Sequence, residues 1–96
     1  MQEFKVGQIV QSIQGHDKGQ LYTVVDVLKD RVLICDGEFK LLDKPKSKNM
    51  IHIKGHNYID SEIATKIKNG LKINDQMIYH SIVKFKKLVK ENMYGK

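Results

Sequence analysis

The sequence predicts a mainly β fold with an α appendage. Residues 1–53 are expected to form a small five-stranded antiparallel barrel, and residues 54–96 a helical extension packed on it as one compact unit. In the first half, short runs rich in Ile, Val, Tyr and Thr are separated by turn residues. In the second half, apolar residues recur with helical spacing. These two observations indicate the fold class.

Five short strands are predicted, at residues 8–13, 20–28, 31–35, 38–41 and 50–53. Lys29-Asp30 makes a tight connection between the second and third. Asp36-Gly37 suits a two-residue type I′ turn into the fourth, since such a turn needs positive φ at both positions. The third strand is apolar on both faces, so we expect something to cover the outer surface of the barrel.

Two helices are predicted to supply that cover. Asp60 or Ser61 is placed to cap the first, and Gly70 to end it in a left-handed conformation. Asn74 is placed to cap the second. The apolar positions of the second helix form one stripe, namely Ile78, Ile82, Phe85 and Val89.

Composition limits the class of protein. The chain has 96 residues, 41% hydrophobic and 29% charged, which is typical of a soluble globular domain. No apolar run approaches the roughly 20 residues that span a bilayer, and the N-terminus does not resemble a signal peptide. With the single Cys35, these features predict a cytoplasmic protein. A net charge of +6 favours polyanionic partners.

The loop between the first two strands is the first candidate site. It reads Gly15-His16-Asp17-Lys18-Gly19. Glycine allows a sharp turn and a close approach of the backbone to a ligand. Asp17 can accept N–H groups within the turn, while His16 and Lys18 point outward toward phosphate oxygens. An ordinary solvent-facing hairpin loop is the alternative.

A lysine-rich linker over residues 44–48 is the second candidate site. Its sequence is Lys44-Pro45-Lys46-Ser47-Lys48. Proline fixes φ and disfavours helix, so the segment is expected to be an extended, stiff, basic ribbon. Such a ribbon can follow a phosphate backbone and release counterions. A loop that only aids solubility is the alternative.

One pattern links the loop to a known family. It reads Gly7-x-x-Val10-x-Ser12-x-x-Gly15-x-Asp17-x-Gly19-x-x-Tyr22-x-Val24. This resembles the KOW element of ribosomal proteins and transcription elongation factors, which forms the first strands of an SH3-like barrel. More loosely, the whole chain is similar to small stand-alone KOW proteins of low-GC Gram-positive bacteria, which are related to a large-subunit ribosomal protein family.

The resemblance implies non-catalytic binding of structured RNA, with ribosomal RNA as the first candidate and ribosomal proteins as further partners. We expect phosphate and shape contacts more than base reading. The expected RNA-binding residues are Gly15, His16, Lys18, Gly19, Lys44, Lys46 and Lys48. The competing class is a protein-interaction module that docks on ribosomal or transcription proteins.

Other chemistry has little support in the sequence. His52 and His56 would converge on a metal only in a helix, and their surroundings do not look helical. Cys35 continues an apolar strand and is expected to be buried and unreactive. No nucleotide-binding motif or opposed carboxylate pair is present, so we expect no enzyme, small-molecule substrate, metal or cofactor.

Two further groups of residues have several interpretations. The lysines of the second helix could aid solubility, contact RNA or lie on an anionic membrane, although the apolar face of that helix is needed by the barrel, so no membrane partner is expected. Tyr22, Phe39 and Tyr58 could stack on bases, but are expected to be core or covering residues.

Overall fold

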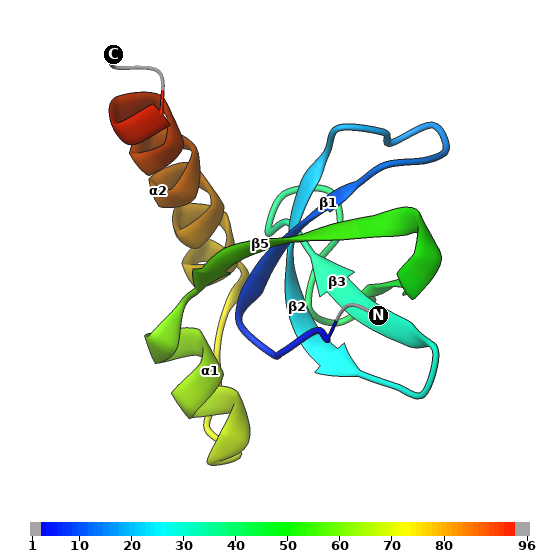
Figure 1. The fold of residues 1–96 in the computed structure, drawn as a ribbon. Coiled ribbons are helices and arrows are strands. Elements are labelled where there is room, and N and C mark those ends of the chain that lie inside the picture. Colours follow the sequence, from blue (N-terminus) through cyan, green and yellow to red (C-terminus); the bar gives the residue numbers. More distant parts are fainter. Residues whose placement is uncertain (1–2, 94–96) are drawn as a thin grey trace.

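The computed structural model describes residues 3–93, which form one antiparallel sheet with two helices beside it (Figure 1). The elements are β1 (Gln8–Ser12), β2 (Leu21–Val27), β3 (Arg31–Cys35), β4 (Lys46–Asn49), η1 (Met50–His52), β5 (Ile53–Ile59), α1 (Ser61–Lys68) and α2 (Asp75–Met93). The strand order is β4-β3-β2-β1-β5. The predicted mainly β class, with five antiparallel strands and two C-terminal helices, is confirmed.

The sheet is open, which differs from the expected barrel. β4 and β5 are its two edges, and they do not pair with each other within residues 3–93. The short 3-10 helix η1 joins these edges and turns the chain from one to the other. β5 then pairs with β1 as far as Ile59, so the sheet continues beyond residue 53, where the barrel was expected to end.

The predicted strand at residues 38–41 is wrong, and so is the type I′ turn before it. One carboxylate oxygen of Asp36 accepts backbone N–H groups from Glu38, Phe39 and Lys40, at 3.0, 2.8 and 2.8 Å. A side chain that takes three successive N–H groups keeps them from a strand ladder. Of the two residues of the predicted turn, Asp36 and Gly37, only Gly37 has positive φ, at +78°, whereas a type I′ turn needs it at both.

The fourth strand instead comes from the segment predicted as a linker. β4 pairs with β3 from Arg31↔Asn49 to Ile34↔Lys46. Its sequence, KSKN, has little intrinsic β propensity, but the ladder to β3 places it at a sheet edge, where lysines are well tolerated. The last predicted strand is also shifted, because Met50–His52 is η1 and β5 begins at Ile53.

Two buried clusters lie on opposite faces of the sheet. The inner cluster contains Phe4, Val10, Tyr22, Val24, Val32, Ile34 and Ile53. The outer cluster joins the sheet to the helices and contains Ile9, Cys35, Ile63, Ile78, Ile82 and Phe85. The third strand therefore buries side chains on both faces, and the prediction that helices cover the outer face is confirmed.

Both predicted helix starts are confirmed. The side chain of Asp60 accepts the N–H of Ile63 at 3.1 Å, and that of Asn74 accepts the N–H of Met77 at 2.9 Å. Gly70 follows α1 with φ +69°, as a left-handed terminator should. Neither these helices nor any other in residues 3–93 is long and apolar enough to cross a bilayer.

Candidate nucleic-acid interface

Asp17, at the tip of the β1–β2 loop, accepts hydrogen bonds from four side chains. The hydroxyls of Ser12 and Tyr22 donate to it at 2.8 and 2.7 Å. The ammonium groups of Lys46 and Lys48, both on β4, lie 2.7 and 3.0 Å from its oxygens. The two candidate sites, the loop and the lysine-rich segment, therefore meet at one carboxylate.

The loop is also held by its own backbone. Gly19 donates its N–H to the carbonyl of Ser12 at 2.8 Å, and Gln20 donates to the carbonyl of Asp17 at 2.8 Å. Gly15 and Gly19 have φ of +98° and +93°, in the region that L side chains rarely adopt. The two glycines thus allow the sharp turn that their positions in the sequence predict, and this turn places Asp17 beside β4.

The electrostatics of this cluster favour the ionised carboxylate. Burial by itself raises the pKa of Asp17, but hydrogen bonds from Lys46, Tyr22, Lys48 and Ser12 outweigh burial and hold the pKa well below its usual range. Conversely, burial and the adjacent Asp17 raise the pKa of the Tyr22 hydroxyl. Two ammonium groups against one carboxylate leave the cluster net positive.

The predicted RNA-binding lysines divide into two groups. The Lys48 side chain is only 11% exposed, and its ammonium also donates to the carbonyl of Gln14 at 3.1 Å. Lys46 is 28% exposed. Lys18, Lys44 and His16 are exposed, and neither lysine forms an ion pair within the described part of the chain. Lys48 and, in part, Lys46 therefore hold the loop, whereas Lys18 and Lys44 are free to contact a ligand.

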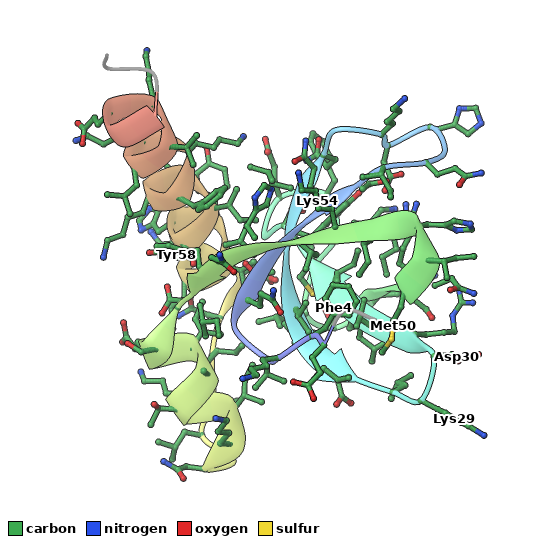
Figure 2. All side chains as sticks on the ribbon, in the orientation of Figure 1. Phe4, Lys29, Asp30, Met50, Lys54 and Tyr58 are labelled. Atoms are coloured by element: carbon green, nitrogen blue, oxygen red, sulfur yellow. The ribbon has the colours of Figure 1, made fainter. Side chains whose placement is uncertain are left out.

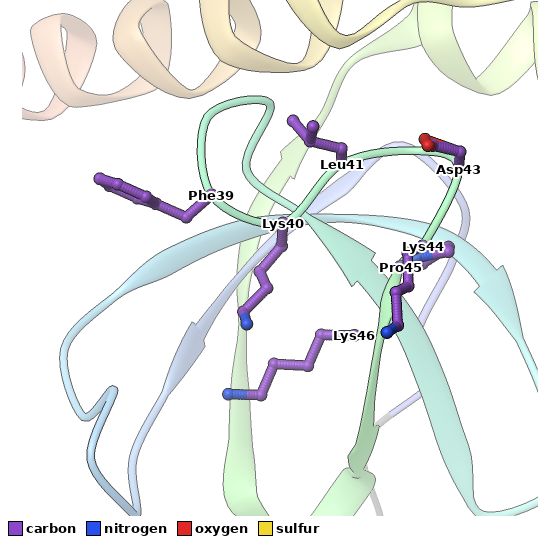
Figure 3. A pocket seen from close by; sticks show the side chains of 7 residues that line it. All are labelled: Phe39, Lys40, Leu41, Asp43, Lys44, Pro45 and Lys46. Carbon is purple, nitrogen blue, oxygen red and sulfur yellow. The ribbon is translucent and has the colours of Figure 1, made fainter.

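A shallow hollow of about 390 Å³ lies beside the lysine-rich segment (Figure 3). The side chains of Lys40 and Lys46 extend to the same side of it. Phe39 also lines the hollow and is 75% exposed, so it is neither a core nor a covering residue. The exposure of Phe39 follows from the loop around Asp36, and no local sequence signal predicts it.

The other two aromatic side chains are core or covering residues, as predicted. Tyr22 is buried and its ring lies 5.9 Å from the Lys46 ammonium. Tyr58 packs edge-on against Phe85 with ring centroids 5.4 Å apart. Sequence reasoning missed the role of Tyr22 in the site, because its hydroxyl reaches Asp17 only once β1 and β2 are paired.

Cys35, the candidate nucleophile, lies away from this cluster, in the outer core. Burial, followed by the charges of Asp75 and Asp36, raises the pKa of the fully buried Cys35 to about 12. Such a thiol is protonated near neutral pH and is a poor nucleophile. Residues 3–93 contain no group of three or more His, Cys, Asp or Glu side chains that could hold a metal.

Comparison with protein-family models gave no match, and comparison with curated proteins gave none either.

Proposed function

We propose that the protein binds structured RNA without catalysis, in the cytoplasm, and that ribosomal RNA is the first candidate. The observation that carries the proposal is the Asp17 cluster, which fixes the glycine-framed loop against the lysines of β4. A loop whose backbone is already held in place suits a phosphate backbone, because the loop itself need not be ordered on binding. The resemblance of the β1–β2 segment to a KOW element, and so to an SH3-like fold, supports the same function.

We assign the direct phosphate contacts to the side chains that are exposed. Lys18, Lys44 and His16 reach phosphate oxygens directly, and Lys46 uses the donors that Asp17 leaves unoccupied. The backbone N–H of Gly15 can add a further donor, but that of Gly19, also expected to contact phosphate, already donates to the carbonyl of Ser12. Lys48 acts indirectly by holding the loop. Since little in this set reads base edges, recognition depends on RNA shape.

Salt dependence tests the proposal. If four or five phosphates are neutralised, the log of the affinity for a labelled stem-loop RNA should fall with log salt at a slope of about −3 to −4. The double variant Lys18→Gln/Lys44→Gln should make this slope shallower by about 1.5. Its melting temperature should not change, because neither side chain forms an ion pair.

Lys29→Gln/Lys72→Gln is the matched control. It removes the same charge, but Lys29 lies in the turn at the other end of β2 (Figure 2) and Lys72 follows α1. A slope equally changed by both pairs would show that only net charge matters and would contradict the proposed site. Sedimentation with the large ribosomal subunit at low salt would support ribosomal RNA, whereas recovery only at the top of the gradient would argue against it.

A second candidate function is docking on a protein, and one observation favours it. A hollow of about 460 Å³ includes Ile13 and Ile51, whose exposed fractions are 46% and 73%. Exposed apolar side chains that adjoin one another often mark protein contacts. Nuclease treatment of a cell extract separates the two functions, since an RNA-dependent association is lost and a protein contact survives.

A further inference from the structure

A groove of about 680 Å³ lies between the sheet and the C-terminal half of α2. Its apolar lining is Leu21, Phe85 and Val89, and its cationic lining is Lys54, Lys86 and Lys90. All three lysines are exposed, and they form no ion pair in the described residues. No acidic side chain lines the groove. An apolar floor with a cationic rim fits a ligand that carries both a flat apolar part and negative charge.

Polar groups within the groove are held in fixed positions. A ring nitrogen of His56 lies 3.0 Å from the side-chain oxygen of Gln11, whose amide donates to the carbonyl of Gly19 at 3.3 Å. The His56 ring also lies 5.0 Å from the Phe85 ring, centroid to centroid. Asn57 adds a further amide to the lining. Preorganised amide and imidazole groups beside an apolar surface can meet the edge of a nucleobase.

The groove is continuous with the proposed RNA interface. Gly19 belongs both to the loop held by Asp17 and to the groove lining. The loop therefore has the lysines of β4 on one side and the groove, with Lys54 of β5, on the other. A strand bound at the loop has a positively charged path into the groove.

We propose that this groove binds an unpaired nucleotide of the same RNA. The base lies against the partly buried Leu21 and Val89 and the small part of Phe85 that remains exposed, and the flanking phosphates contact Lys54, Lys86 and Lys90. The inference rests on the proposed function and makes it more specific, because the ligand becomes a duplex next to a single-stranded segment. Lys86 and Lys90 are one helical turn apart, so both can face the same strand.

The test compares two labelled RNAs, a blunt hairpin and the same hairpin with a short 3′ uridine overhang. The full chain should bind the overhang form about tenfold more tightly, given the usual strength of base stacking. Lys86→Gln/Lys90→Gln should remove most of this preference and should leave blunt-hairpin affinity nearly unchanged. The control Lys84→Gln/Lys87→Gln makes the same charge change on the same helix, at positions that do not line the groove, and should keep the preference.

Crosslinking provides a second measurement. 4-Thiouridine in the overhang should crosslink to peptides that contain Phe85 or His56. Equal affinity for the two RNAs, equal effects of the two double variants, or crosslinks confined to other peptides would each overturn the inference. So would displacement by polyglutamate alone and not by the overhang strand, since the groove would then suit an acidic protein segment.

The experiments distinguish failure of the groove inference from failure of the proposed function. If Lys18→Gln/Lys44→Gln weakens binding to both RNAs while Lys86→Gln/Lys90→Gln has no effect, the groove inference is wrong and the loop interface stands. If the unmodified chain binds neither RNA with a salt-dependent affinity, both are wrong.

Discussion

Asp17 is the residue that organises the proposed interface. Its carboxylate is surrounded by two hydroxyl and two ammonium donors, all within 3.0 Å. Tyr22 is buried and its hydroxyl donates to this carboxylate, whereas the buried Ser12 hydroxyl also lies within reach of the carbonyl of Gln14, at 3.0 Å. A polar group that loses its only buried partner retains a desolvation cost. The Asp17 carboxylate therefore fixes both the loop conformation and the positions of Lys46 and Lys48.

Replacing this carboxylate should weaken the fold. We expect Asp17→Asn to lower the free energy of unfolding by about 1–3 kcal/mol, because charge-assisted hydrogen bonds become neutral and two ammonium groups lose their counterion. Chemical denaturation measures the change. Asp30→Asn, at an exposed turn with no side-chain partner in residues 3–93, is the control and should change stability by less than about 0.5 kcal/mol. Equal effects of the two would contradict the role of Asp17.

The same carboxylate should make stability depend on acid pH. The pKa of Asp17 is lower in the folded chain than in the unfolded one. Its contribution is therefore fully present above the unfolded pKa of about 3.9 and is lost as pH falls through the folded pKa. The difference in melting temperature between the unmodified chain and Asp17→Asn should be constant above about pH 5 and shrink below about pH 4. A difference that grows on acidification would contradict this assignment.

At the scale of elements, the loop after β3 is fixed to the start of α2. Leu42 donates its N–H to the Asp75 carboxylate at 2.8 Å. A Cβ at Gly37 would meet the carbonyl oxygen of Asp75 and would lie 2.6 Å from the backbone nitrogen of Tyr79. The loop that presents Phe39 and Lys40 is therefore tied to the helix that borders the proposed nucleotide groove.

Substituting alanine for Gly37, at this junction, and for Gly70, away from it, separates the cost of backbone strain from the cost of packing. Gly37 and Gly70 have similar φ, +78° and +69°, but a Cβ at Gly70 would have no neighbour within 4 Å. Gly70→Ala should cost about 1–2 kcal/mol from the left-handed backbone alone. Gly37→Ala should cost at least about 2 kcal/mol more, because α2 must move away. Denaturant melts measure both. Equal costs would show that the loop does not pack tightly on α2.

The whole molecule is built on a sheet that is buried on both faces. The outer cluster combines side chains of β1, β3, α1 and α2, so neither the sheet nor the helices can bury their apolar surface alone. Strands and helices should therefore unfold in one cooperative transition.

Two phenylalanines test this cooperativity. Phe85, 8% exposed, lies in the outer cluster, and Phe85→Ala should cost about 3–5 kcal/mol. The melting temperature of the variant should fall by the same amount whether unfolding is followed by a helix-sensitive or a strand-sensitive signal. Phe39→Ala is the control, since a side chain that is 75% exposed contributes little to stability. Helix loss that leaves the sheet intact would contradict a single folding unit.

Several elements were determined by the sequence alone. The runs that form β1 to β3, the caps Asp60 and Asn74, and the apolar stripe of α2 depend on neighbours only a few residues apart, so local patterns predict them. The positions of Gly15 and Gly19 predicted a turn for the same reason.

Only the tertiary structure decided the rest. The polar segment β4 forms a strand because it pairs with β3. Residues 38–41, predicted as a strand, form a loop because Asp36 accepts their backbone N–H groups. The pairs of Asp17 with Lys46 and Lys48 join residues 29 and 31 positions apart. The proposed nucleotide groove needs β1, β5 and α2 together. These features depend on which distant segments share a surface, and that free energy arises from packing the whole chain, which no local pattern contains.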